Sequence, residues 1–235
     1  MRVVPLGDRA LLIQLGTTID EETHRQVRAV SARLTSHPVP GLIELVPAFA
    51  SVAVHYDPAR VPNDRPQFGR RVARSPYVRF VEAVEAALAN IGDEPLPAPR
   101  TFEIPVRYGG DEGPDRAVVA QAHGLTTEEV VRLHTGGTYR VYMLGFAPGF
   151  AYLGGLPEVL ATPRRDEPRT AVPAGSVGIG GSQTGIYPLV SPGGWQIIGR
   201  TSVSLFDPRR TPPTLLAVGD VVRFRAVGPD DAAAA

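Results

Sequence analysis

The sequence contains no cysteine. This absence excludes disulfide bonds, thiol nucleophiles and cysteine-ligated metals. Lysine is absent too, since all 24 basic residues are arginine. The chain therefore has neither a Schiff-base lysine nor the lysine with which a Walker loop reaches phosphates. The formal net charge is +0, so the composition gives no indication of binding to nucleic acid or to an anionic membrane.

Long hydrophobic runs are also missing. No apolar stretch approaches the ~18 residues that span a membrane, and residues 1–16 lack the apolar core of a signal peptide. We therefore expect a soluble, cytoplasmic protein. The 235 residues include 43% hydrophobic side chains, enough for one large or two small packed domains. The five histidines are scattered without metal-ligand spacing, so we assign no metal.

The first 92 residues have the pattern of a small α+β domain. Apolar, β-branched segments predict strands at residues 2–6, 10–15, 42–47 and 51–56. Asp20 is the expected N-cap of a helix ending near residue 37, and Ser75 begins a second helix that Gly92 ends. The expected buried residues are Val27, Val30 and Leu34 in the first helix and Val81, Val84, Leu88 and Ile91 in the second. The order β-β-α-β-β-α places both helices on one face of a sheet.

Three prolines at alternate positions in residues 93–100 predict a stiff linker between two domains. We divide the chain into an α+β domain at 1–92, this linker at 93–100, a β-barrel domain at 101–228 and a disordered tail at 229–235. The barrel is predicted from short strand candidates separated by glycine and proline turns. These candidates are residues 101–108, 139–144, 177–179, 186–188, 195–199, 202–206, 214–218 and 221–225.

Three local signals complete the prediction for the barrel domain. Gly219-Asp220 is expected to turn a hairpin between the last two strands. Asp115 is the expected N-cap of a short helix that runs to Ala122. Thr126 and Glu129 form a capping box at the start of the next helix.

Residues 139–201 have the features of a binding surface. Glycine and proline are dense there while apolar residues persist, which is typical of an irregular path packed over a rigid base. Within it, residues 163–169 combine three arginines with two carboxylates. A self-paired, solvated loop is the usual interpretation of such a charge run. However, Pro163 and Pro168 fix its spacing, and arginine suits recognition of carboxylate or phosphate.

The glycine-rich segment at 175–185 leaves two interpretations open. A Walker or dinucleotide loop is not expected, because the lysine is missing and Pro188 prevents a following helix. The segment forms either tight barrel turns or a row of backbone N–H groups around an anion. No G-x-S-x-G motif surrounds a serine, so we do not expect a serine hydrolase. Trp195 is expected at a pocket rim, and the other aromatic residues of this region in the core.

Five motifs in this region occur in an order that resembles the KipI / allophanate hydrolase subunit 1 family. They are GFAPGFAYL at 145–153, PRRDEPR at 163–169, VPAGSV at 172–177, QTGIYP at 183–188 and SPGGW at 191–195. The segment GDRALL at 7–12 resembles the N-terminal signature of the same family. The resemblance therefore covers nearly the whole chain, with Gly180 in place of the family's alanine as a small departure.

The resemblance implies an α+β N-terminal domain followed by a cyclophilin-like β-barrel C-terminal domain. Members include the B-type subunit of bacterial 5-oxoprolinase, which implies ATP-dependent opening of 5-oxo-L-proline to L-glutamate. The implied partners are an allophanate hydrolase subunit 2-like protein (the C-type subunit of 5-oxoprolinase), with a homologous barrel, and an A-type subunit of the LamB/YcsF type. ATP would bind at the level of this complex, and the chain is expected to be inactive alone.

The implied substrate is a small carboxylate with an amide carbonyl. We therefore expect Gln183 and Thr184 to act catalytically, as preorganised donors that polarise the carbonyl. Arg169 is expected to hold the substrate carboxylate or a phosphate. The expected substrate-binding residues are Arg164, Arg169, Ser176, Tyr187, Ser191 and Trp195.

Two other functions are compatible with the resemblance. The family takes its name from an inhibitor of a sporulation histidine kinase, so a regulatory binding protein without turnover is one alternative. A carboxyltransferase-like module of a biotin-dependent urea carboxylase, or allophanate hydrolase, is the other. It ranks lowest, because the chain lacks the biotin domain and its lysine.

Overall fold

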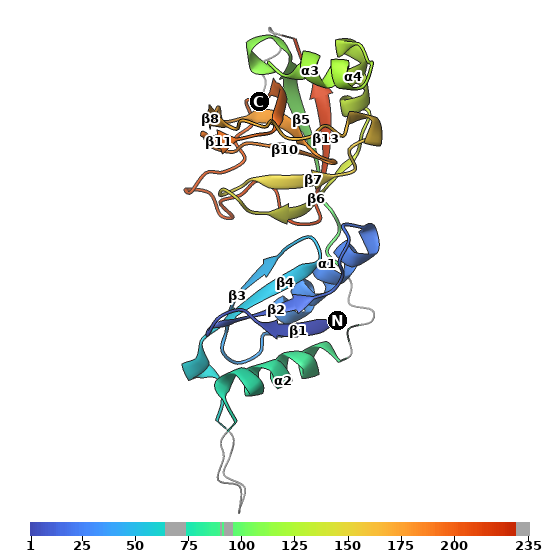
Figure 1. The fold of residues 1–235 in the computed structure, drawn as a ribbon. Helices are drawn as coiled ribbons and strands as arrows, with labels where there is room; N and C mark the ends of the chain where they lie inside the picture. Colours follow the sequence, from blue (N-terminus) through green and yellow to red (C-terminus); the bar gives the residue numbers. More distant parts are fainter. Residues whose placement is uncertain (64–73, 90, 92–95, 229–235) are drawn as a thin grey trace, which may run out of the picture. The chain divides into compact units, whose positions relative to one another are not determined.

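The structure is a computed structural model that describes residues 1–63, 74–89, 91 and 96–228 (Figure 1). The chain divides into two compact units, Met1–Ala98 and Pro99–Ala235, called here the N-terminal unit and the barrel unit. The division falls within the proline-rich segment at 93–100. The expected helix stop at Gly92, the first part of that segment and the tail at 229–235 lie outside the described residues.

The N-terminal unit contains a four-stranded antiparallel sheet in the order β1-β2-β4-β3. Its elements are β1 (Arg2–Pro5), β2 (Ala10–Gln14), α1 (Glu21–Ser36), β3 (Leu42–Pro47), β4 (Ser51–Tyr56), the 3-10 turn η1 (Pro58–Arg60) and α2 (Pro76–Leu88). The predicted order of strands and helices in this unit is confirmed. Both helices pack on the sheet face that carries Leu11, Ile13, Val52 and Val54.

The two helices begin where their capping residues predict. The Asp20 carboxylate accepts a hydrogen bond from the Thr23 amide at 2.7 Å, and the Ser75 hydroxyl accepts one from the Val78 amide at 3.3 Å. The three residues predicted to be buried in α1 are buried. In α2 the fully buried residues include Phe80 in place of the predicted Val81. The Phe80 ring stacks on Tyr56, with ring centroids 4.3 Å apart.

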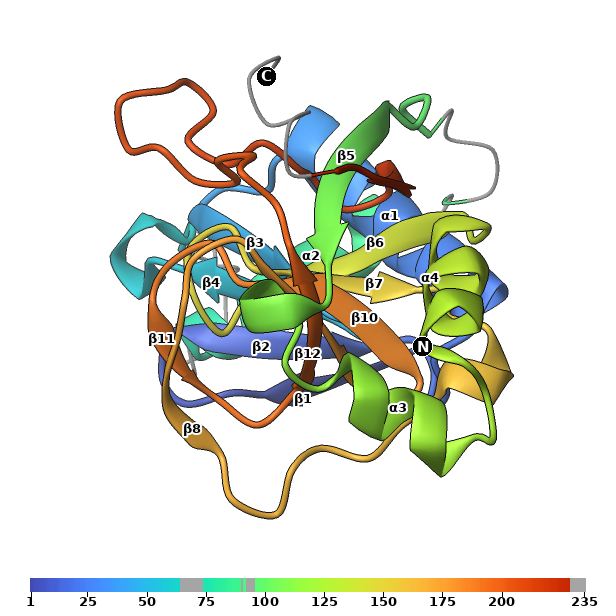
Figure 2. The ribbon, with the colours of Figure 1, turned by 90° about the horizontal axis from the view of Figure 1, so that it is seen from above.

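The barrel unit is built around a closed barrel in the order β10-β7-β6-β13-β5-β12-β9 (Figures 1 and 2). Its strands are β5 (Thr101–Tyr108), β6 (Tyr139–Leu144), β7 (Ala151–Gly154), β9 (Ser176–Gly180), β10 (Gln183–Ile186), β12 (Gln196–Arg200) and β13 (Val221–Ala226). The last strand, β13, lies parallel to the first, β5, and this pairing helps to close the barrel. The interior holds branched aliphatic side chains such as Val177, Ile179 and Leu153.

Several predicted strands in the second half of the barrel unit are wrong. Residues 202–206 and 214–218 form no strands and touch only through an isolated bridge between Phe206 and Thr214. β10 ends at Ile186, so residues 186–188 are not a strand either. Two segments that were not predicted as strands, β8 (Arg169–Val172) and β11 (Ser191–Gly193), pair as a separate two-stranded ribbon. β7 was not predicted either.

The expected hairpin at Gly219-Asp220 is also wrong. The Asp220 carboxylate accepts from the Ala217 amide at 2.8 Å and from Arg100 Nε at 3.1 Å. These bonds hold the turn beside the start of β5, so the chain enters β13 as the neighbour of β5 and β6. Gly219-Asp220 does lie in a turn, but β13 pairs with β5 and β6, which are distant in sequence, and not with the segment just before the turn.

Two short helices pack on the barrel: α3 (Arg116–Ala122) against β12, and α4 (Thr127–Thr135) against β13. The capping box of α4 is confirmed, because Thr126 Oγ1 accepts from the Glu129 amide at 3.1 Å and the Glu129 carboxylate accepts from the Thr126 amide at 2.7 Å. The unit also contains the 3-10 turns η2 (Gly110–Glu112) and η3 (Glu158–Leu160). None of the helices in the described parts of the chain has the length and hydrophobicity needed to cross a lipid bilayer.

Candidate functional site

An aromatic layer, defined here as Phe150, Tyr152, Tyr187 and Trp195, lies on the outside of the barrel. Phe150 is at its centre, with ring centroids 4.8 Å from Tyr152, 5.3 Å from Tyr187 and 5.5 Å from Trp195. All three contacts are edge-to-face, the geometry that aromatic pairs prefer. Trp195 is only 5% exposed, so it is a buried member of this layer and does not lie at an open rim.

The glycines of β9 and β10 allow the layer to approach the barrel closely. A Cβ atom on Gly180 would lie 2.6 Å from the Trp195 ring, and one on Gly185 would lie 3.0 Å from the same ring. The backbone of β9 and β10 is paired on both sides in the barrel. Of the two interpretations of the glycine-rich segment, the structure therefore supports tight packing, and not a row of free N–H groups around an anion.

The ribbon of β8 and β11 packs against this layer. Arg169 is the register partner of Gly193, and a Cβ atom on Gly193 would lie 2.3 Å from the Tyr187 hydroxyl oxygen. Burial raises the pKa of Tyr187, while a hydrogen bond from the Trp195 backbone and the charges of Arg164 and Arg169 act in the opposite direction. The ribbon therefore brings arginine charge to the edge of the aromatic layer.

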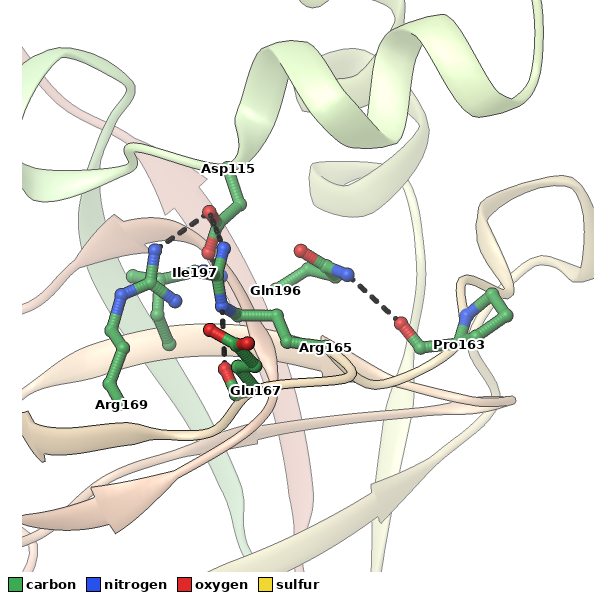
Figure 3. Close-up of polar contacts among 7 residues, drawn as sticks. All are labelled: Asp115, Pro163, Arg165, Glu167, Arg169, Gln196 and Ile197. Carbon is green, nitrogen blue, oxygen red and sulfur yellow. Dashed lines mark hydrogen bonds and ion pairs between the residues drawn. The ribbon is translucent and has the colours of Figure 1, made fainter.

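Two of the three arginines in the predicted charge run converge on one carboxylate, that of Asp115 (Figure 3). Arg169 Nη2 lies 2.7 Å from Asp115 Oδ1, and Arg165 Nη1 lies 3.3 Å from the same oxygen. The side chain of Asp115 is 4% exposed. The third arginine, Arg164, has its guanidinium carbon 5.9 Å from the centroid of the Trp195 ring. Within the run, Arg165 Nε donates to the Glu167 carbonyl at 3.3 Å, but the ion pairs of Arg165 and Arg169 are with Asp115, 50 or more residues earlier in the chain. The run is thus not a self-paired loop.

Asp115 occupies the N-cap position of α3 (Arg116–Ala122), as predicted, but its side chain does not act as the cap. Its side chain makes no capping hydrogen bond to α3. Instead, its second carboxylate oxygen accepts from the Ile197 amide at 2.7 Å, and its own amide donates to the Ile197 carbonyl at 2.8 Å. A carboxylate already bonded to β12 and to two guanidiniums is not available to the first turn of α3.

Four polar atoms around this region are buried without a hydrogen-bond partner among the described residues. They are Arg169 Nη1, Gln183 Nε2, Ser191 Oγ and Gln196 Oε1. A buried polar group without a partner costs free energy, so each such group requires an explanation, and a bound ligand or water supplies one. Three of the four atoms belong to residues that the sequence already singled out.

Gln183 and Thr184 lie on opposite faces of β10, because successive side chains of a strand alternate. Gln183 is the register partner of Gly180, so its side chain shares the outer face with Trp195. Thr184 is completely buried in the barrel interior, where its hydroxyl donates to the Gly178 carbonyl at 2.9 Å. The structure therefore separates the two residues that were expected to polarise one carbonyl together.

Thr184 belongs to a buried chain of polar groups instead. His134 Nε2 lies 2.9 Å from Thr184 Oγ1, and His134 Nδ1 lies 2.7 Å from the Tyr108 hydroxyl. Since the threonine hydroxyl donates to Gly178, the Nε2 atom must carry the proton and Nδ1 must accept from Tyr108. This assignment satisfies every polar group in the chain of contacts, as a buried network requires.

Burial lowers the pKa of His134 to about 3, which predicts a specific dependence of stability on pH. Its unfolded pKa is about 6.5, so below that pH the unfolded state binds a proton that the folded state does not. The free energy of unfolding should fall by up to ~1.4 kcal/mol per pH unit as the pH drops from about 6.5 towards 3. Denaturant unfolding of wild type and His134→Asn at pH 7.5 and 5 measures this, and equal slopes in both proteins would contradict it.

The other expected site residues occupy the same outer face or its edge. Ser191 lies opposite Val172 in the ribbon, and Val172 packs with the aromatic layer. Ser176 is buried on β9, two positions from Gly178 and at the opposite end of the strand from Gly180. The structure thus brings Arg164, Arg169, Tyr187, Ser191, Trp195 and Gln183 to one side of the barrel and leaves Thr184 inside.

The sequence predicted only a capping role for Asp115, included Arg165 only as part of the charge run at 163–169, and did not single out Gln196. Gln196 Nε2 donates to the Pro163 carbonyl at 3.0 Å (Figure 3), which fixes the start of the arginine segment. Arg165 also holds this segment, because its backbone N–H donates a hydrogen bond to the Gly194 carbonyl at 2.7 Å. No local signal reveals these contacts, because each joins segments that are distant in sequence.

An open hollow of about 320 Å³ borders the aromatic layer and is lined by residues of the segment 144–149. Phe146 lies in this segment with φ of +70°, an uncommon conformation for a residue with a side chain. Its side chain is 64% exposed, and its ring meets Phe150 edge-on at 5.4 Å. Because its backbone conformation is strained and its ring is exposed, Phe146 has the features of a residue that contacts a ligand or a partner protein. No group of three or more potential metal ligands was found among the described residues.

Comparison with known proteins gives a consistent result. The family described as "Carboxyltransferase domain, subdomain C and D" matches residues 1–216. The B subunit of 5-oxoprolinase from Bacillus subtilis (strain 168) is 46% identical over 98% of this chain and 94% of its own length. The protein of the same name from Escherichia coli O157:H7 is 44% identical over 93% of each chain.

Solved structures show the same fold. The crystal structure of TTHA0988 matches with a TM-score of 0.77 and 38% identity over 94% of this chain. This chain spans only 40% of the length of TTHA0988. The Kluyveromyces lactis urea carboxylase matches with a TM-score of 0.75 over 97% of this chain and 22% of its own. At 19% identity, that likeness concerns the fold alone.

Proposed function

We propose, from the premise that this chain belongs to the family of the carboxyltransferase domain, subdomain C and D, that it is the B-type subunit of a 5-oxoprolinase. In this role it helps to open the lactam of 5-oxo-L-proline to L-glutamate with hydrolysis of ATP. The proposal is supported by the relatives of that name, which are 42–46% identical over nearly the whole chain. The observation that carries it is the set of buried donors beside the aromatic layer that lack a hydrogen-bond partner within the described part of the chain.

The chemistry of these donors suits the substrate. 5-Oxoproline has one carboxylate and one amide carbonyl on a small ring. We infer that Arg169 Nη1, which is buried and without a partner in the described residues, binds the carboxylate, because guanidinium–carboxylate hydrogen bonds are among the strongest in proteins. Gln183 Nε2 is also buried without a hydrogen-bond partner among the described residues. We infer that it polarises the carbonyl as a preorganised donor. Arg164 adds positive charge at the Trp195 ring.

Thr184 takes a different part in this proposal from the one expected. Because it is enclosed in the barrel and bonded to the Gly178 carbonyl, it fixes the strands that present Gln183 and does not touch substrate. Ser191 Oγ is the further donor on the outer face. ATP is assigned to the assembled complex, because the chain has no lysine and hence no Walker loop.

We further propose that the chain works with an allophanate hydrolase subunit 2-like protein, which is the C-type subunit of 5-oxoprolinase, and with an A-type subunit of the LamB/YcsF type. Support for a covalently or non-covalently attached neighbour comes from TTHA0988, since this chain accounts for only 40% of its length. The exposed Phe146 beside the hollow is a candidate contact for such a neighbour. Large exposed aromatic residues are enriched at protein–protein interfaces.

The test is reconstitution. The three purified subunits are mixed and assayed for 5-oxoproline-dependent ATP cleavage and glutamate formation, and each subunit is omitted in turn. Activity that requires all three supports the proposal. No activity in the complete mixture would contradict it and would favour the regulatory alternative, in which the same surface binds a kinase without turnover.

A further inference from the structure

Among the described residues, Asp115 is the one carboxylate that contacts the arginines of this site, and its position is set by the backbone. Its amide and its Oδ2 atom both bond to Ile197 on β12, at 2.8 and 2.7 Å. The approach depends on Gly113, where a Cβ atom would lie 2.1 Å from the Ile198 carbonyl oxygen. The position of the carboxylate is therefore fixed by the backbone and does not depend on the arginines.

The remaining oxygen, Oδ1, controls how Arg169 is presented. It lies 2.7 Å from Nη2 of Arg169, which fixes one end of the guanidinium. The other end, Nη1, is buried and has no hydrogen-bond partner among the described residues. A guanidinium is planar and rigid, so fixing Nη2 also fixes the direction in which Nη1 donates.

Charge in the cluster supports a ligand over a purely structural pair. Arg165 and Arg169 share one carboxylate, and Arg164 lies over Trp195 without an ion pair to any carboxylate of the described residues. One negative charge thus serves at most two of three positive charges. A buried ion pair is weak evidence for stability in itself, whereas a partly neutralised arginine cluster suits an anion.

We propose that Asp115 is a positioning residue, which orients Arg169 so that Nη1 is presented to the carboxylate of the ligand. The inference rests on the proposed function for the identity of that ligand. Without the carboxylate, Arg169 retains its charge but loses its fixed direction. Binding should therefore weaken while the chemical step, which Asp115 does not touch, changes little.

The kinetic test uses the complex reconstituted from all three chains and the variant Asp115→Asn. Asparagine keeps the shape and one acceptor oxygen but loses the charge. KM for 5-oxoproline is expected to rise at least ~10-fold, with kcat within about 3-fold of wild type. The matched control is Asp220→Asn, which changes a similarly buried aspartate paired with Arg100 on the same barrel. The control should leave KM unchanged, and an unchanged KM in Asp115→Asn would overturn the proposal.

A spectroscopic readout on the single chain separates this inference from the proposed function. Nitrogen-15 spectra of labelled arginine should show distinct Nη1 and Nη2 signals for Arg169, assigned by their loss in Arg169→Lys. The two signals should merge in Asp115→Asn and stay distinct in Asp220→Asn. If the wild-type complex has no activity, the proposed function fails, and the nitrogen-15 spectra alone decide whether Asp115 orients Arg169. Distinct signals in Asp115→Asn would overturn the positioning role. If that variant fails to fold, Asp115→Ser, which also lacks the charge, replaces it, with merged signals again expected and distinct signals again overturning the role.

Discussion

Replacing Arg169 by alanine should reduce ATP-dependent glutamate formation by the reconstituted complex at least ~10-fold, because a hydrogen bond to a charged group contributes about 1.5–3 kcal/mol. The reduction should come from the loss of Nη1, the buried donor without a partner in the described residues. Gln183→Ala should reduce the rate by a similar factor, since it removes the other buried donor of the outer face. The measurement is the rate of glutamate release as a function of 5-oxoproline concentration.

The control for both variants is Arg225→Ala. Arg225 pairs with Glu103 on the exposed surface of the same barrel, so its removal changes a surface ion pair of small energetic value and leaves the site intact. Its rate should equal that of wild type. If Arg169→Ala and Gln183→Ala both keep the wild-type rate, neither residue belongs to the substrate site.

A second large effect is expected for Gly175→Ala, this time on stability. Gly175 has φ of +83°, and a Cβ atom there would lie 2.1 Å from the Thr201 carbonyl oxygen. The left-handed conformation costs about 1–2 kcal/mol for a residue with a side chain, and forcing backbone apart adds about 1–3 kcal/mol. The free energy of unfolding of the barrel unit should fall by about 2–5 kcal/mol in denaturant titrations.

Gly181→Ala is the matched comparison, because Gly181 also has positive φ, +65°, but a Cβ atom there would have nothing within 4 Å. Only the conformational cost of about 1–2 kcal/mol applies there. Equal destabilisation by the two substitutions would contradict the prediction that a Cβ atom at position 175 clashes with the Thr201 carbonyl. The activity of Gly181→Ala should be retained, since the strands that carry the site are not displaced.

The N-terminal unit could be predicted well, because its signals are local. Capping residues such as Asp20 and Ser75 make their hydrogen bonds within one turn, and the buried stripe of α1 follows the helical repeat. The barrel could be predicted only in outline. Gly219-Asp220 turns no hairpin, because residues 214–218 form no strand and β13 pairs with β5 and β6. β5 lies more than a hundred residues earlier in the chain, and no local pattern carries that information.

The candidate site shows the same division. The types of residue were predictable, since arginine, amide and aromatic side chains gather in residues 139–201. Their arrangement was not, because strand alternation puts Gln183 outside and Thr184 inside, and the sequence predicted a strand at 186–188 where β10 is Gln183–Ile186. Asp115 was missed because aspartate before a helix is usually a cap, and its contact with β12 is visible only in three dimensions.

The most direct test of the central claim is a crystal structure of the complex of all three chains with 5-oxoproline bound. We predict that the ligand carboxylate lies within ~3 Å of Arg169 Nη1, the length of a charge-assisted hydrogen bond, with its lactam carbonyl directed at Gln183. A ligand bound elsewhere, with Arg169 Nη1 still lacking a partner, would contradict the account.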